Sequence, residues 1–129
     1  MRKREIIHTD GAPKAIGPYS QALRAGEMIF TSGQLGLDPA SGKLVEGGIE
    51  AQTRQVLENL GKILRASGSD VGNILKTTIF ITKIDEFPLV NKIYGESFPA
   101  DPPARSTVEV SRLPMGALIM IDAVALIEE

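Results

Sequence analysis

Residues 117–127 place apolar side chains on both faces of a single strand, and this feature constrains the fold more than any other. Alternate positions carry alanine, isoleucine, leucine, methionine or valine, and the one charged residue among them is Asp122. A sheet that is apolar on both sides must be covered on both sides. The helices of one chain cover one face. We therefore expect further copies of the chain to bury the other face.

Residues 50–67 show the spacing of an amphipathic helix, with Val56, Leu60 and Ile63 on one side. Glycines 47 and 48 precede this segment, and Ser67 with Gly68 is typical of a helix end. A second helix is expected to start at Asp85 as its N-cap, to hold Pro88 in its first turn and to end near Phe98.

The remaining apolar segments predict strands. Residues 23–25 and 28–32 form an expected hairpin, a first strand reaches His8, and residues 74–82, 104–110 and 117–127 follow. In the segment 74–82, Leu75, Thr77, Ile79 and Ile81 are expected on one face. The order β-β-α-β-α-β-β predicts an α+β fold with two helices packed on one face of a mixed sheet.

Composition narrows the function. The chain has 129 residues and a formal net charge of −2, with 43% hydrophobic residues, which favours one domain over residues 1–129. It has no cysteine and one histidine, His8, to which we assign no role. These counts exclude disulfides, thiolate metal sites and a cysteine nucleophile, and they argue against a transition-metal enzyme. Residues 1–5 are basic, but a signal-like apolar run does not follow, so we expect a cytoplasmic protein with no membrane association.

Arg105 is the most chemically suggestive residue, because it is predicted on a strand that begins just after Pro102 and Pro103. A planar guanidinium on a rigid element is suited to bind a carboxylate with two hydrogen bonds. The alternative is an ordinary surface arginine on a half-solvated strand. Pattern alone favours that alternative.

Two further segments could line a ligand site. Ser32 and Gly33 end a strand with a small hydroxyl and a glycine that permits close approach of a ligand. An ordinary turn glycine explains the pattern equally well. Tyr19 follows Gly17 and Pro18 in a turn and presents a phenol hydroxyl, although packing is the usual role of a lone tyrosine.

Together, these segments resemble the reactive intermediate deaminase family, also called the RidA/YjgF family. The resemblance covers almost the whole chain and runs in one order through several stretches. The matching stretches are APKAIGPYSQA at 12–22, TSGQ at 31–34, residues 52–60, residues 76–78, Phe87, residues 90–91, residues 103–106 and residues 113–114.

The resemblance implies a chorismate-mutase-like subunit in a homotrimer, with the sheets around a central barrel and three ligand clefts between neighbouring subunits. It implies hydrolysis of 2-aminoacrylate, 2-aminocrotonate and their imines to 2-keto acids and ammonia, with no cofactor. In this reading Arg105 binds the substrate carboxylate and is the catalytic residue. The expected substrate-binding residues are Arg105, Tyr19, Ser32, Gly33, Thr107, Asn91 and Phe87.

Two positions depart from the family pattern. Thr107 stands where the family often has cysteine, and Met120 stands where archetypal deaminases have a glutamate thought to position the attacking water. The second acid of that motif is shortened here to Asp122. Methionine cannot act as a base, so the residues favour either water placement by other groups or a slower or different activity.

Three hypotheses follow, in decreasing order of support. The first is a 2-iminobutanoate/2-iminopropanoate deaminase, favoured by Arg105 with Tyr19, Ser32 and Gly33. The second is a regulatory protein that binds small carboxylates with little turnover, favoured by Met120. The third is an RNA-directed translation inhibitor, as reported for some relatives. The net charge of −2 and the sequence pI of about 5.5 argue against a nucleic-acid partner.

Overall fold

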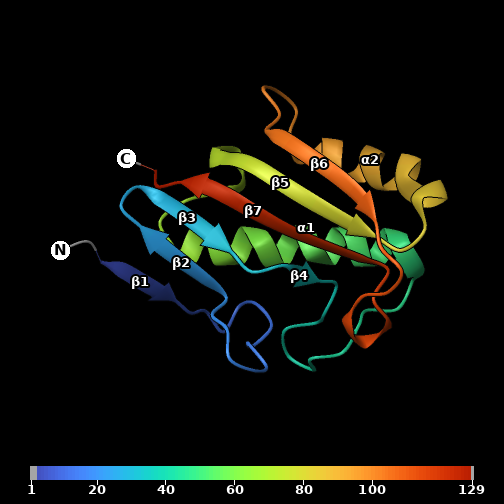
Figure 1. Cartoon of the computed structure of the whole chain (residues 1–129), viewed down its shortest axis with the longest axis horizontal. Helices are drawn as coiled ribbons and strands as arrows, with labels where there is room; N and C mark the ends of the chain where they lie inside the picture. Colours follow the sequence, from blue (N-terminus) through green and yellow to red (C-terminus); the bar gives the residue numbers. More distant parts are fainter. Residues whose placement is uncertain (1–2, 129) are drawn as a thin grey trace.

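The computed structural model describes residues 3–128, and in that range two helices pack on one face of a seven-stranded mixed sheet (Figure 1). The sheet order is β1-β2-β3-β7-β5-β6, with β4 also paired to β7. The β5–β6 pair is parallel and the other named pairs are antiparallel. The strands are β1 (Arg4–Ile7), β2 (Ala22–Ala25), β3 (Met28–Thr31), β4 (Gln34–Leu35), β5 (Ile74–Ile81), β6 (Ala104–Glu109) and β7 (Ile119–Leu126). The predicted α+β class is confirmed.

The first helix, α1 (Gly48–Ala66), confirms the helix expected over residues 50–67. Val56 and Ile63 are fully buried against the sheet, as the apolar spacing predicts. The helix starts two residues earlier than expected because the chain turns at Gly47, whose φ is 117°. A Cβ at Gly47 would lie 2.8 Å from that of Ala51, so this entry into the helix requires glycine.

The second helix, α2 (Phe87–Glu96), is shorter than the sequence predicts. The expected cap by Asp85 is wrong, because Asp85 lies in a 3₁₀ turn, η2 (Ile84–Glu86), and the N-cap residue is Glu86. Glu109 holds that turn instead, since its Oε1 accepts a hydrogen bond from the Ile84 N–H at 2.9 Å. Pro88 lies in the first helical turn, as expected.

The strand β5 departs from the predicted alternation at its first residues. Leu75 was expected on the same face as Thr77, Ile79 and Ile81. Those three residues are buried, but Leu75 is 42% exposed, and Ile74 is buried instead. A shift in the β5–β7 register between Ile74 and Lys76 causes this difference, because the additional residue of a bulge reverses the facing of its neighbour. Two further differences are small. The strand β1 ends at Ile7, before His8, and the two-residue strand β4 was not predicted.

The two faces of β7 have different surroundings. Ile119, Ile121, Ala123 and Ala125 are buried in the core beneath the helices. Met120, Asp122 and Val124 alternate with them and are partly exposed. Residues paired to this second face are also solvent-accessible: Phe30, opposite Val124, is 44% exposed. Within the described residues of one chain, this face of the sheet has no covering layer (Figure 1).

Candidate functional site

Arg105 is the second residue of β6, and its guanidinium lies near two aromatic rings of α2. Its Cζ is 5.1 Å from the ring centroid of Phe87 and 5.0 Å from that of Tyr94. Its Nη1 donates a hydrogen bond of 2.8 Å to Oδ1 of Asn91. These contacts lie within the range of cation–π attraction, and they hold an otherwise exposed cation in one place.

Tyr94 is the buried member of this group, with 4% of its surface exposed. Its hydroxyl forms a 2.7 Å hydrogen bond with Oγ1 of Thr77, and its ring packs on Phe98 with centroids 4.7 Å apart. Burial raises the pKa of the Tyr94 phenol, while the hydrogen bond from Thr77 and the charge of Arg105 oppose that rise. The phenol is therefore neutral at physiological pH, and its hydroxyl stays available for the hydrogen bond with Thr77.

Tyr94 was not among the site residues expected from the sequence, and its contact with Arg105 was missed. A signal was present, because Phe87, Asn91 and Tyr94 follow the i, i+4, i+7 spacing of one helical face. The sequence does not show where this face of the helix lies relative to the sheet. The parallel pairing of β5 with β6 sets Arg105 opposite Thr77, beneath α2.

A cavity of about 410 Å³ opens beside the guanidinium. Arg105 and Asn91 contribute the polar part of its wall, and Tyr94, Phe98 and Pro103 contribute apolar surface. An anion with a small apolar body matches this combination of one cation and aromatic walls.

The second group of expected site residues lines a different cavity of about 470 Å³. Tyr19, Ser32 and Gly33 lie in its wall together with Met120. The Tyr19 hydroxyl accepts a 3.2 Å hydrogen bond from the Ile16 N–H, which orients the ring in its turn.

Two contacts involve residues that line this second cavity. The Ser32 hydroxyl donates to the carbonyl of Ser20. Gly33 was expected to let a ligand approach, and the space beside it is instead taken up by Met120: a Cβ at Gly33 would lie 2.7 Å from the methionine Sδ. The glycine therefore accommodates the methionine side chain at this point.

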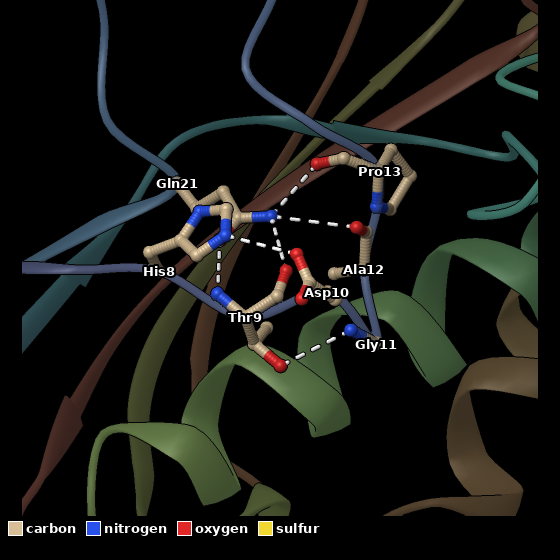
Figure 2. A network of polar contacts seen from close by, with 7 residues as sticks. All are labelled: His8, Thr9, Asp10, Gly11, Ala12, Pro13 and Gln21. Atoms are coloured by element: carbon tan, nitrogen blue, oxygen red, sulfur yellow. Dashed lines mark hydrogen bonds and ion pairs between the residues drawn. The ribbon is translucent and has the colours of Figure 1, made fainter.

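Gln21 fixes the loop that forms one wall of this cavity (Figure 2). Its side chain is almost fully buried, and its Nε2 donates to the carbonyls of Pro13 at 2.8 Å and Thr9 at 3.0 Å. Its Oε1 accepts from the Thr9 N–H at 2.7 Å. Gln21 was given no role from the sequence, because a buried glutamine that hydrogen-bonds to backbone groups of a loop has no local sequence signature.

His8 pairs with Asp10 at 3.0 Å on the surface, away from both cavities.

The charges around the second cavity are unusual for a site of acid–base chemistry. Among the described residues that line it, Lys14 is the only charged one. Asp122 lies two residues beyond Met120 on the uncovered face of β7. Its burial raises the pKa of the carboxyl, against hydrogen bonds from Thr78 and the charge of Lys76. Among residues 3–128, the wall of this cavity thus contains neither a carboxylate nor a histidine that could act as a general base.

One chain does not bring all the expected residues together. Arg105, Asn91 and Phe87 form one group, and Tyr19, Ser32 and Gly33 form another. Thr107 follows Arg105 on the same face of β6, opposite Ile79, and lines neither cavity. The two groups also lie toward opposite faces of the sheet, because Arg105 packs under α2 whereas Met120 lies on the uncovered face.

Two other classes of site are not supported by residues 3–128. Groups of three or more histidine, aspartate and glutamate side chains able to hold a metal ion do not occur in this range. A helix long and apolar enough to cross a membrane is also lacking there.

Comparison with known proteins places the chain. The model of the family described as Endoribonuclease L-PSP matches residues 9–127. The chain belongs to this family, the RidA/YjgF family. It is 50% identical over 123 residues to Reactive Intermediate Deaminase A, chloroplastic, of Arabidopsis thaliana, with 95% of this chain and 66% of that protein covered.

Other members of the RidA/YjgF family are similar along nearly their whole length. The human 2-iminobutanoate/2-iminopropanoate deaminase is 47% identical over 123 residues, covering 95% of this chain and 90% of the human protein. The crystal structure of a Rid family protein from Yersinia pestis has a TM-score of 0.94 and 48% identity, covering 97% of this chain and all of the other. These likenesses confirm the fold and support a reactive intermediate deaminase in general terms.

Proposed function

We propose that this RidA/YjgF protein hydrolyses 2-iminobutanoate, 2-iminopropanoate and their enamine tautomers, 2-aminocrotonate and 2-aminoacrylate, to 2-keto acids and ammonia. The observation that carries the proposal is the clamped guanidinium of Arg105. Asn91 takes a hydrogen bond from one of its nitrogens at 2.8 Å, and the side chain is otherwise exposed. A guanidinium has five N–H donors, so a carboxylate could be bound at the remaining edge.

The reaction requires the protein mainly to orient the substrate relative to one water molecule. Once the enamine has become the imine, the oxygen of a water molecule forms a bond to C2, the π bond between C2 and nitrogen breaks, and a proton of that water passes to nitrogen. In the resulting carbinolamine the hydroxyl proton is transferred to the amino nitrogen, the C2–N bond breaks, and ammonia leaves as the keto group forms. Binding the carboxylate at Arg105 fixes C2 relative to a water molecule, which lowers the entropic part of the barrier. This route requires neither a nucleophilic side chain nor a cofactor.

We further propose that the complete site forms between neighbouring subunits of a homotrimer. The Arg105 group and the group of Tyr19, Ser32 and Gly33 line separate cavities of one chain. The uncovered face of β7, with Val124 and the 44% exposed Phe30, supplies an apolar surface on which a second copy could pack. Packing around that face would join the two groups from adjacent chains, and residues 1–129 would act as one deaminase domain.

A second candidate function has its own supporting observation. Met120 lines the cavity of Tyr19 and Ser32, and that cavity has Lys14 as its only charged lining residue among those described. A site that binds carboxylates but lacks a base would turn over slowly and could serve as a sensor of small 2-keto acids. Catalysis is the better-supported candidate, because unassisted imine hydrolysis in water already makes a base dispensable.

The deciding experiment generates the enamine in the cuvette. A serine or threonine dehydratase produces 2-aminoacrylate or 2-aminocrotonate, and stopped-flow absorbance follows its decay with and without this protein. We expect faster decay with the wild type and no acceleration with Arg105→Ala. His8→Ala is the matched control, since His8 is exposed and its side chain hydrogen-bonds to Asp10 rather than to a residue of either cavity. Tight 2-oxobutanoate binding with unchanged enamine decay would instead establish the sensor.

Two accompanying assignments belong to the proposal. A cytoplasmic location is proposed from the sequence, although one relative carries the name chloroplastic. The partners proposed are small 2-imino and 2-keto acids and further copies of the chain, rather than nucleic acid. The net charge of −2 supports this choice despite the family description as an endoribonuclease, and incubation with single-stranded RNA tests it directly.

A further inference from the structure

We propose that Tyr94, anchored by Thr77, is a positioning residue that fixes the orientation of the Arg105 guanidinium. Its effect on the reaction rests on the proposed function, since Arg105 is the expected carboxylate-binding group. Its effect on the arginine itself does not. The two effects are therefore measured separately below.

The Arg105 side chain is ordered before any ligand binds. An exposed arginine has a long side chain with several rotatable bonds, and ordering it on ligand binding costs conformational entropy. In this protein the guanidinium already contacts the rings of Phe87 at 5.1 Å and Tyr94 at 5.0 Å, and Asn91 accepts a hydrogen bond from Nη1. Pre-ordering of this kind increases affinity by reducing the entropy lost on binding.

Tyr94 is held more firmly in the core than Phe87. Phe87 is at the start of α2 and only partly buried, whereas Tyr94 is 4% exposed and is tied at both ends. Its hydroxyl bonds Oγ1 of Thr77 at 2.7 Å, and its ring packs on Phe98. Of the two rings, Tyr94 is the fixed reference against which the guanidinium is placed.

The pairing register of β5 and β6 places the hydrogen-bond partner of Tyr94 next to Arg105. Thr77 on β5 is directly opposite Arg105 on β6 in the parallel pair. The hydrogen bond from the Tyr94 hydroxyl therefore ends on the strand position next to the arginine backbone. It links α2, β5 and β6 around one side chain. A phenylalanine at position 94 would keep the ring but lose this link, and it would leave the Thr77 hydroxyl buried without its partner.

Val90 supplies a matched control for the structural part of this arrangement. It lies on α2 and is fully buried in the same core, but it does not line the cavity beside Arg105. Val90→Ala should reduce packing as a core substitution does. A residue that acts on Arg105 and a residue that only fills the core are thereby distinguished.

The first measurement needs no substrate. Nitrogen-15 relaxation of the Arg105 Nε–Hε group, assigned by its loss in Arg105→Lys, gives an order parameter for the guanidinium. We expect a rigid value of about 0.85 in the wild type and in Val90→Ala, and a value below about 0.6 in Tyr94→Leu. Tyr94→Phe and Thr77→Val should lie between these limits. A rigid guanidinium in folded Tyr94→Leu, or a mobile one in the wild type, would overturn the proposal.

The second measurement is calorimetric titration with 2-oxobutanoate. Loss of one ring from the clamp should raise Kd by about two- to thirtyfold in Tyr94→Leu. Tyr94→Phe should recover most of that loss, and Val90→Ala should stay within twofold of the wild type even where its thermal midpoint falls. Equal losses in Tyr94→Leu and Val90→Ala would contradict the positioning role. If the wild type fails to bind 2-oxobutanoate while the relaxation results hold, the proposed function fails and the positioning of Arg105 stands.

Discussion

A Cβ atom at Gly33 would lie 2.7 Å from Sδ and 2.9 Å from Cγ of Met120. Atoms of this kind do not approach so closely, and both residues line the same cavity. The missing side chain at position 33 and the long one at position 120 are therefore complementary. Together they determine the floor of the cavity that also contains Tyr19 and Ser32.

This complementarity predicts a coupled effect on stability. Gly33→Ala should lower the free energy of unfolding by about 1–3 kcal/mol, because the added methyl group overpacks the Met120 side chain. Gly33 is absent from the residues with positive φ, so the backbone itself tolerates alanine. In a Met120→Ala background the same change should cost much less. Urea denaturation of the four proteins checks this, and an equal cost in both backgrounds would refute the contact.

Met120→Glu should raise deaminase activity. A positioned carboxylate that assists proton transfer typically contributes about 10²- to 10⁴-fold, and the wild-type cavity lacks one among its described lining residues. The control is Met120→Gln, which has the length of glutamate without its charge. Iminobutanoate hydrolysis and thermal midpoints should be measured together, since a new acid near Asp122 can destabilise the strand. A wild type already as fast as glutamate-bearing relatives, with no gain in a folded variant, would show that water is placed by other groups.

Arg105→Ala should weaken 2-oxobutanoate binding by about ten- to hundredfold, the range expected for a charge-assisted hydrogen bond of about 1.5–3 kcal/mol. The fold should persist because the side chain is exposed. Arg105→Lys should restore little, because an ammonium lacks both the forked N–H donors and the planar, delocalised charge that Arg105 places near Phe87 and Tyr94. Calorimetric titration measures each affinity. Unchanged affinity in the alanine variant would remove Arg105 from the site.

The sequence predicted those parts of the fold that depend on one segment at a time. The period of apolar residues in α1 is a property of the helix alone, and Val56 and Ile63 are buried as expected. Leu75 was misplaced because a bulge arises from the pairing of β5 with β7, which the residues of β5 do not encode by themselves. Asp85 was misassigned because the 3₁₀ turn before α2 is fixed by Glu109, a residue 24 positions away along the sequence.

The candidate site likewise contains residues that could be predicted from the sequence and contacts that could not. Arg105 could be proposed from its type and its expected strand, and the family resemblance added Phe87 and Asn91. The contact of Arg105 with Tyr94 could not be predicted, because it depends on how α2 crosses above β5 and β6. The separation of Tyr19 from Arg105 within one chain likewise follows only from the three-dimensional arrangement.

Asp122 should make stability depend on pH in a defined direction. Burial raises the pKa of its carboxyl in the folded chain above the unfolded value, despite hydrogen bonds from Thr78. A raised pKa means that the folded state favours the protonated acid, so this contribution is present below the unfolded pKa of about 3.9 and is lost as the pH rises through the folded pKa. Asp122→Asn should therefore have a higher thermal midpoint than the wild type at pH 7, and the difference should shrink toward pH 3. Calorimetry across that range would count against the assignment if the difference were constant.

The uncovered sheet face leads to a prediction about assembly. Sedimentation equilibrium at micromolar concentration should give three times the chain mass of 13.8 kDa. Phe30→Lys should dissociate the assembly, because Phe30 lies opposite Val124 on that face and burying an unpaired ammonium there is costly. Leu89→Lys is the matched control: Leu89 is 40% exposed, close to the 44% of Phe30, but it lies on α2 on the other side of the sheet. A monomeric wild type would leave the apolar face without the expected partner. A dimer would keep that partner but rule out three equivalent clefts, and equal effects of the two lysines would show that this face is not the interface.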